Sequence, residues 1–190
     1  MRLEIFGEHN LMNLNGAKSI CNCLGIGDDD FYNAIQSFKG AARRLEKLAS
    51  SDNVSVFKDF AHSPSKLKAT IQAAAIQFPL RKLIACMELH TFSSLNENFL
   101  EEYLRCMDQA TEACVYFNPH TIEHKKLKPI TIEQVKKSFG RDDLKVFTSS
   151  DELQKWLFAQ SYENSVLLMM TSGTFDGMDL KKLAEQVIIK

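Results

Sequence analysis

Short apolar runs alternate with segments of helical periodicity through most of this chain. Residues 83–87, 113–117 and 165–170 are three apolar runs with the length of strands that are buried on both faces. Segments whose apolar side chains recur every three or four positions separate these runs, as in residues 64–78. This alternation predicts an α/β fold in which an open, mostly parallel sheet carries helices on both faces.

The C-terminal part of the chain continues the pattern. Ser63 followed by Pro64 is typical of a helix start, and Ser149 with Glu152 has the spacing of a capping box. Periodicity alone predicts further helices at 97–107, 131–139 and 178–188, and a short strand at 144–147. Helices thus connect the predicted strands, as parallel pairing requires.

The first 60 residues are organised differently. Residues 10–24 and 28–38 predict two helices that carry too few apolar residues for a core of their own. Two strands joined by a polar turn follow within residues 44–58. We therefore expect residues 1–40 to be the tail of a preceding domain and residues 41–190 to form the α/β domain.

Charge, hydropathy and cysteine content argue against several classes of function. The net charge of -1 provides no basic surface for nucleic acid, and no apolar run approaches the roughly 20 residues that span a membrane. Residues 1–6 lack the apolar stretch of a signal peptide, and the five cysteines have no paired spacing. We therefore expect a cytoplasmic protein with reduced thiols, and neither nucleic acid nor a membrane as a partner.

Polar residues directly follow the predicted strands. They occupy residues 59–65, 88–94, 118–121 and 171–176. The carboxyl ends of parallel strands share one edge, and ligands of open α/β sheets bind outside that edge. We therefore expect these segments to form a ligand-binding surface along one edge of the sheet.

Three motifs near the N-terminus contain side chains suited to a nucleotide. Asn10 and Asn13 lie three apart at the start of a predicted helix, and an amide offers the donor and acceptor that an adenine edge requires. Arg44, within Arg-Arg-Leu-Glu, has the planar fork that suits phosphates. Asp59 and His62 belong to Asp-Phe-Ala-His-Ser-Pro at the end of a predicted strand. The residues alone also fit helix capping, a surface ion pair and a turn cap.

In this order the three motifs resemble the Mur ligases, the ATP-dependent amide-bond-forming enzymes of bacterial cell-wall synthesis. The resemblance covers nearly the whole chain and implies a Rossmann-like C-terminal domain, preceded by two helices of the central ATP-binding domain. Together with His-Thr-Phe-Ser-Ser-Leu at residues 90–95, the motif sequences are most similar to those of one branch of the family. The enzymes of this branch join UDP-N-acetylmuramate to a recycled murein tripeptide. No Gly-x-x-x-x-Gly-Lys-[Ser/Thr] phosphate loop occurs among the eight glycines, so we interpret the chain as the C-terminal piece of a longer enzyme.

The resemblance also implies roles for individual residues. Asn10 and Asn13 match contacts to adenine, Arg44 matches a contact to the nucleotide phosphates, and Asp59 matches the acceptor for the ribose hydroxyls. His62 is expected to be a neighbour of the nucleotide. We expect Asp59 to contribute little to packing, because it stands at the end of a strand.

A second group of expected contacts lies after the last strand, where Thr-Ser-Gly-Thr-Phe-Asp-Gly occupies residues 171–177. Glycines let backbone amides approach an anionic ligand. The resemblance implies that Ser172, Gly173, Phe175 and Asp176 contact the incoming peptide, with Phe175 against its apolar part. Asp176 either repels a peptide carboxylate or holds a cationic group.

The implied function is the ATP-dependent joining of UDP-N-acetylmuramate to the tripeptide L-Ala-γ-D-Glu-meso-diaminopimelate in murein recycling. ATP is the expected nucleotide. The Mg2+ ligands are expected in the central domain, so this chain is expected to hold no catalytic or metal-binding residue and to be inactive alone. Two alternatives stay open: the C-terminal domain of a UDP-N-acetylmuramate–alanine ligase, and a non-catalytic nucleotide-binding domain. The roles of Glu88 and His90 are not assigned.

Overall fold

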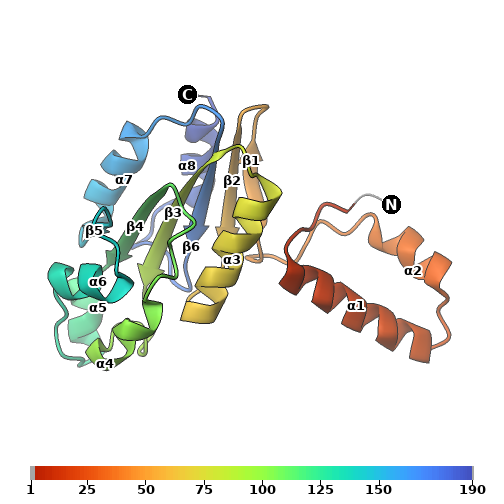
Figure 1. Cartoon of the computed structure of the whole chain (residues 1–190), viewed down its shortest axis with the longest axis horizontal. Coiled ribbons are helices and arrows are strands. Elements are labelled where there is room, and N and C mark those ends of the chain that lie inside the picture. The colour runs from red at the N-terminus through yellow and green to blue at the C-terminus, as the bar shows by residue number, and fades with distance from the viewer. Residues whose placement is uncertain (1–2, 190) are drawn as a thin grey trace.

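A six-stranded sheet forms the centre of the computed structural model, which describes residues 3–189 (Figure 1). The strands are β1 (Glu46–Ser50), β2 (Val54–Asp59), β3 (Lys82–Leu89), β4 (Glu112–Phe117), β5 (Lys145–Phe147) and β6 (Ser165–Met170). Their order in the sheet is β1-β2-β6-β3-β4-β5, and β1 is antiparallel to β2 while the other neighbours are parallel. The predicted open, mostly parallel sheet is confirmed.

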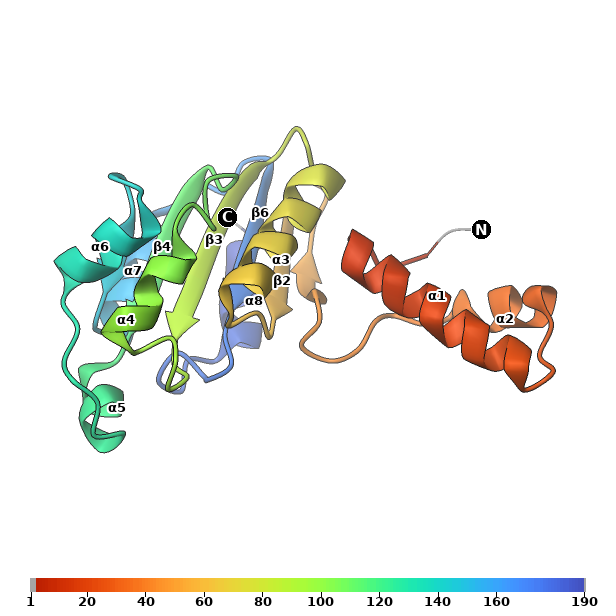
Figure 2. The same cartoon turned by 60° about the horizontal axis from the view of Figure 1, so that its bottom comes forward.

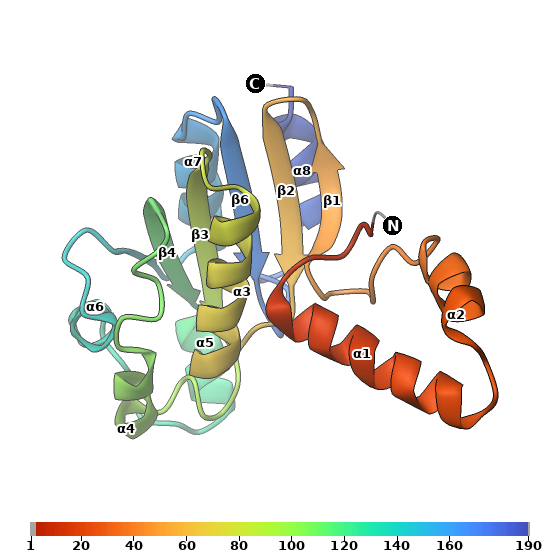
Figure 3. The ribbon, with the colours of Figure 1, turned by 45° about the vertical axis from the view of Figure 1, so that its right-hand side comes forward.

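Helices cover both faces of this sheet (Figure 3). One face carries α3 (Pro64–Gln77), α4 (Glu97–Leu100) and α6 (Ile132–Phe139), and the other carries α7 (Ser150–Ala159) and α8 (Leu180–Val187). Ser63 is the N-cap residue of α3, and α7 begins where the Ser149 hydroxyl accepts a hydrogen bond from the Glu152 N–H. Within residues 3–189, no helix combines the length and apolarity needed to cross a membrane.

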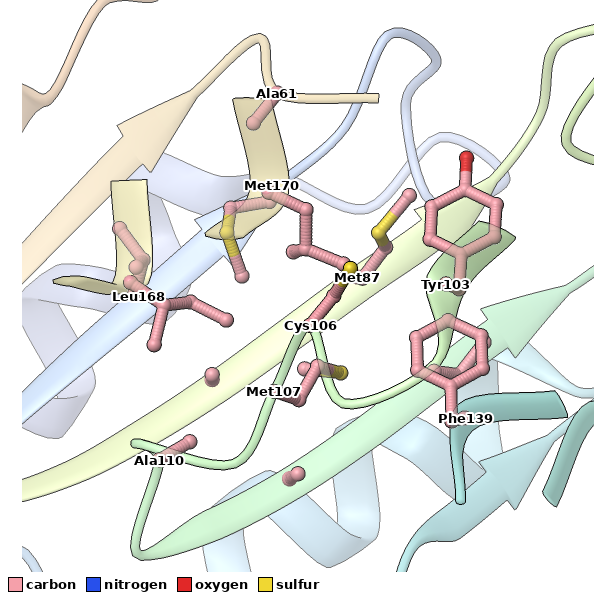
Figure 4. Close-up of a cluster of buried hydrophobic side chains, with 14 of the residues drawn as sticks. Ala61, Met87, Tyr103, Cys106, Met107, Ala110, Phe139, Leu168 and Met170 are labelled. Atoms are coloured by element: carbon pink, nitrogen blue, oxygen red, sulfur yellow. The ribbon is translucent and has the colours of Figure 1, made fainter. Parts of the chain in front are cut away.

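The strands distribute their side chains between two hydrophobic cores. On the α3 side, Met87 and Leu168 lie in one cluster with Tyr103 and Phe139, whose rings stack at 5.1 Å (Figure 4). The side chain of Leu167, next along β6, belongs to the core under α7 and α8. Burial on both faces explains why these strands read as continuous apolar runs.

Helices α1 (Glu8–Cys23) and α2 (Asp28–Ile35) form a pair beside the sheet (Figure 2). None of the residues of α1 is buried. The segment that enters α1 is anchored by the ring of Phe6, whose centroid lies 5.4 Å from that of Phe57 and 5.7 Å from that of Phe78. Both predicted helices are present, and the assignment of residues 1–40 to a separate domain stays a prediction.

The helix predicted over residues 97–107 is wrong. α4 ends at Leu100, a single 3-10 turn covers Glu101–Tyr103, and Arg105 has a φ of 59°. The Arg105 N–H donates to the Phe139 carbonyl at 3.1 Å. This bond to the end of α6 replaces a bond within the helix, so tertiary pairing overrides the helical periodicity of the segment.

A short helix, α5 (Pro119–His124), is absent from the sequence prediction. The Asn118 side chain caps it by accepting a hydrogen bond from the His120 N–H at 2.9 Å, and Pro119 occupies its first turn. An asparagine followed by proline directly after a strand is a helix-start pattern that would have predicted this element.

Candidate functional site

The Arg-Arg-Leu-Glu motif forms a turn rather than the start of a strand. Arg43 has a φ of 60° and Leu45 a φ of 45°, values that few residues other than glycine adopt. The Arg43 N–H donates to a Glu46 carboxylate oxygen at 2.7 Å, and the Arg43 carbonyl accepts from the Phe60 N–H at 2.8 Å. These bonds fix the backbone around Arg44 and leave Arg44 exposed.

The Asp59 carboxylate closes the same turn from the end of β2. Its Oδ2 accepts a hydrogen bond from the Leu45 N–H at 2.7 Å, and its Oδ1 accepts from the Ala61 N–H at 2.7 Å and the Thr70 hydroxyl at 3.3 Å. Asp59 is only 5% exposed. The expectation that Asp59 contributes little to the folded structure is wrong, because its carboxylate satisfies two buried backbone donors.

Asn13, Arg44 and Asp59 line one cavity of about 360 Å³ between α1 and α3, together with Lys66. Asn10 lines a cavity of about 480 Å³ that shares Asn13 and Arg44 with the first. The Asn10 side-chain amide also donates to the Phe6 carbonyl at 2.8 Å. The structure therefore brings residues of three separate motifs around the same space.

His62 is not among the residues that line these two cavities. Its Nδ1 lies 2.8 Å from the Phe60 carbonyl oxygen, and its ring meets the Phe60 ring edge-on at 5.1 Å. Its own carbonyl accepts a hydrogen bond from the Tyr103 hydroxyl at 2.5 Å. These contacts hold the loop before α3, and the contact of His62 with a nucleotide stays a prediction.

The loop after β6 is anchored at Phe175. Phe175, Asp176 and Gly177 have consecutive φ values of 50°, 59° and 84°. Phe175 is 0% exposed, its ring lies 6.1 Å from that of Tyr116, and its carbonyl accepts a hydrogen bond from the Ser150 hydroxyl at 2.7 Å. The predicted packing of Phe175 against a substrate is therefore wrong, because this ring belongs to the core under α7 and α8.

The buried carboxylate of Glu88 holds this loop from β3. Glu88 is 2% exposed, and its Oε2 accepts hydrogen bonds from the Phe175 N–H at 2.9 Å and from the Thr171 hydroxyl. Its Oε1 lies 3.5 Å from His90 Nδ1. The predicted strand ends at residue 87, whereas β3 continues to Leu89, so Glu88 lies within the sheet. A glutamate is rarely buried this fully unless it is paired, and the partners of Glu88 come from a loop more than 80 residues later in the chain.

The predicted substrate residues of this loop have different environments. Ser172 Oγ is buried and has no hydrogen-bond partner among the described residues, and Gly173 packs against Glu88. Asp176 is exposed. Burial raises the pKa of Tyr116 to about 12, and the negative charges of Asp176 and Glu88 act in the same direction. The Tyr116 hydroxyl therefore stays neutral near the loop.

Asp176 and Gly177 line a cavity of about 760 Å³ between the first turns of α7 and α8. Its other titratable lining residues are His120, Asp151, Asp179 and Lys182. The Asp179 carboxylate caps α8 by accepting from the Lys181 and Lys182 N–H groups at 3.1 and 3.0 Å. A second cavity therefore lies at the carboxyl ends of the strands, and its lining residues are far in sequence from the turn that contains Arg44.

Gly173 is a tight contact between this loop and β3. A Cβ atom there would lie 2.8 Å from Glu88 Oε2 and 2.8 Å from two ring atoms of His90. We expect Gly173→Ala to lower the free energy of unfolding by about 1–3 kcal/mol, as overpacking does, measured by urea denaturation. Gly16→Ala in α1 is the matched control, because its Cβ would meet nothing within 4 Å. Equal stability of the two variants would contradict the tight contact.

The structure is an open α/β domain with cavities at the carboxyl ends of parallel strands, which is the edge where ligands of such sheets bind. Residues 43–173 match the sequence family described as Mur ligase, glutamate ligase domain. This match covers more than half of the chain, and the chain belongs to the Mur ligase family. The UDP-N-acetylmuramate–L-alanine ligase of Lactobacillus helveticus is 34% identical over 116 residues, which are 60% of this chain and 26% of that protein. The chain thus spans about a quarter of the length of its curated relatives.

Solved structures of Mur ligases share the fold. The UDP-N-acetylmuramate–alanine ligase of Thermotoga maritima has a TM-score of 0.73 at 22% identity, over 98% of this chain and 38% of that one. A murein peptide ligase of Psychrobacter arcticus has a TM-score of 0.61 at 21% identity, over 100% of this chain and 38% of that one. The MurF ligase of Thermotoga maritima, solved in complex with ADP, has a TM-score of 0.64 at 16% identity, over 96% of this chain and 38% of that one. The predicted family is confirmed, whereas the predicted branch stays a prediction.

Proposed function

We propose that this chain is the C-terminal domain, with the last two helices of the central domain, of an ATP-dependent ligase that forms an amide bond on UDP-N-acetylmuramate. The observation that carries this proposal is the meeting of Asn13, Arg44 and Asp59 around one cavity. Each of the three belongs to a different motif of the resemblance. Membership in the Mur ligase family supports the same reading.

The chemistry of this cavity suits a nucleotide. The exposed Arg44 offers a planar fork of donors to phosphate oxygens, and Lys66 adds a second cation. The Asn13 amide offers a donor and an acceptor to a base edge. A carboxylate has about four acceptor positions, so Asp59 can accept from a ribose hydroxyl beyond its three internal bonds.

In the proposed reaction, the muramate carboxylate is activated by ATP as an acyl phosphate, which an amine then attacks with loss of phosphate. We expect the phosphate loop and the Mg2+ ligands in the central domain, outside this chain. The residues of this chain bind and orient: Arg44 neutralises phosphate charge, and the cavity beside Asp176 positions the amine. Alignment and charge neutralisation then lower the barrier without a covalent nucleophile.

We assign the tripeptide L-Ala-γ-D-Glu-meso-diaminopimelate as the amine substrate and the cavity beside Asp176 as its site. The cavity of about 760 Å³ offers much more room than alanine fills. The carboxylates of Asp151 and Asp176 suit the ammonium group of diaminopimelate.

Alanine is the second candidate substrate, and the comparisons with known proteins favour it. The Lactobacillus helveticus relative is an alanine ligase, and so is the Thermotoga maritima protein with the TM-score of 0.73. Phosphate release by the complete enzyme, measured with each amine in competition, separates the two. Preference for alanine would reject the tripeptide assignment, and ATP binding without phosphate release would favour a non-catalytic domain.

Arg44→Ala in the complete enzyme should raise the KM for ATP about 10- to 100-fold, since hydrogen bonds to charged groups contribute about 1.5–3 kcal/mol. Arg44→Lys should recover part of this loss, because it keeps the charge without the planar fork. Lys47→Ala, on the exposed side of β1, is the control for removal of a positive charge. An unchanged KM for ATP in Arg44→Ala would remove the main support for the nucleotide site.

A further inference from the structure

The loop after β6 has a backbone conformation that its sequence does not favour. Phe175 and Asp176 both lie in the left-handed region, with φ values of 50° and 59°. This conformation costs about 1–2 kcal/mol for each L-residue, and it persists only where surrounding contacts enforce it. Gly177, at 84°, is the one member of the turn that adopts it without strain.

Several contacts enforce the turn, and they converge on Phe175. Its N–H donates to Glu88 Oε2 at 2.9 Å, and its carbonyl accepts from the Ser150 hydroxyl at 2.7 Å. The Phe175 ring is fully buried in the core. Glu88 Oε2 also accepts from Thr171, at the start of the loop. One buried carboxylate on β3 therefore holds both ends of the segment from residue 171 to residue 175.

Resting on the function proposed above, we infer that Glu88 is a positioning residue and Asp176 a specificity-determining residue for the amine substrate. Glu88 fixes the left-handed turn at Phe175, and this turn places Asp176 on the wall of the cavity. Asp176 then selects an amine substrate that carries a cationic group.

The arrangement of charges supports this division of roles. Glu88 is 2% exposed and bonded within the protein, so it acts on a substrate only through the loop. Asp176 is exposed and lines the cavity. The Asp179 carboxylate there is engaged as the cap of α8, which leaves Asp151 as the other carboxylate of the lining. Lys182 also lines the cavity, so one ammonium faces three carboxylates and the lining stays negative on balance. A cation bound there is therefore attracted more strongly than a neutral side chain of the same size.

The first arm of the test uses this chain and needs no substrate. In Glu88→Ala, the NMR amide shifts and the HN–Hα couplings of residues 175–177 should change to those of an ordinary loop. Glu88→Gln should retain them, because its amide oxygen still accepts from the Phe175 N–H. Glu185→Ala, an exposed change on α8, is the control. Unchanged loop signals in Glu88→Ala would overturn the role of Glu88.

A second variant tests the turn without touching the buried carboxylate. Ser150→Ala removes the hydroxyl that donates to the Phe175 carbonyl. The same amide signals should shift in the same direction, by a smaller amount than in Glu88→Ala. Unchanged signals in this variant would show that the turn does not depend on its anchoring bonds.

The second arm measures kinetics in the complete ligase. Glu88→Ala should raise the KM for the tripeptide about tenfold, the loss of roughly one hydrogen bond, while the KM for ATP stays within about twofold. Glu88→Gln should stay close to the parent. Equal rises in both KM values would indicate a general structural role and overturn the positioning role.

Asp176→Asn tests the selection of a cation, since asparagine tolerates the left-handed region and removes the charge. The parent should prefer a tripeptide ending in diaminopimelate over one ending in alanine, and the variant should lose this preference. A preference that persists in Asp176→Asn would overturn the role of Asp176. Absence of turnover by the parent enzyme would refute the proposed function, while the NMR arm would still decide the role of Glu88.

Discussion

Asp59→Ala should lower the free energy of unfolding of this chain by about 2–5 kcal/mol, because each buried donor left without a partner costs about 1–3 kcal/mol. The variant leaves the Leu45 and Ala61 N–H groups without their acceptor. Single domains are stable by only about 5–15 kcal/mol, so the loss is large. Urea denaturation followed by circular dichroism measures it.

Two further variants make the Asp59 result specific. Asp52→Ala, in the exposed turn between β1 and β2, removes a carboxylate that faces solvent and should change stability by less than about 0.5 kcal/mol. Asp59→Asn keeps one acceptor oxygen and should fall between the parent and Asp59→Ala. If Asp59→Ala proved as stable as Asp52→Ala, the carboxylate would contribute little to the folded structure, and the ribose contact that the resemblance implies would be its remaining role.

Phe175→Ala should lower the free energy of unfolding by about 3–5 kcal/mol, the usual cost of truncating a buried aromatic side chain to alanine. Phe175 is 0% exposed and packs near Tyr116 in the core under α7 and α8. Phe92→Ala is the matched control: Phe92 is 61% exposed, and the Lys125 ammonium lies 4.1 Å from the centroid of its ring. Phe92→Ala should lower the free energy of unfolding by only about 0.5–1 kcal/mol, the contribution of an exposed cation–π contact. Equal losses in thermal or urea unfolding would mean that Phe175 is not a core residue in solution.

The strands of this fold could be predicted because burial on both faces leaves a strong pattern. β4 and β6 are apolar for nearly their whole length, and the residues around them change to helical periodicity. The sequence does not determine where β3 ends, because Glu88 interrupts its apolar run and yet belongs to the sheet. A charge inside a strand depends on tertiary partners, here Thr171 and Phe175, which no local pattern contains.

The candidate nucleotide site was partly predictable. The motifs named Asn13, Arg44 and Asp59, which the structure brings around one cavity, and their contacts with a nucleotide stay a prediction. They did not predict that the Arg43 and Leu45 backbones would adopt left-handed values, since this conformation arises from hydrogen bonds to Glu46 and Asp59. The motifs also did not predict that His62 lies outside the lining of this cavity, because proximity to Asp59 in sequence does not determine where a loop side chain lies.

The position of β6 in the sheet has a consequence for the order in which the protein folds. β2 and β3 each pair with β6 and not with one another, although β6 is the last strand of the chain. Until residues 165–170 have left the ribosome, the strand that pairs with both β2 and β3 is missing from the sheet. The edges of β2 and β3 that face β6 in the finished sheet therefore have no strand partner until this last strand is made. Such long-range pairing is slow, and the open edges are the points where an incomplete chain is most prone to associate with another.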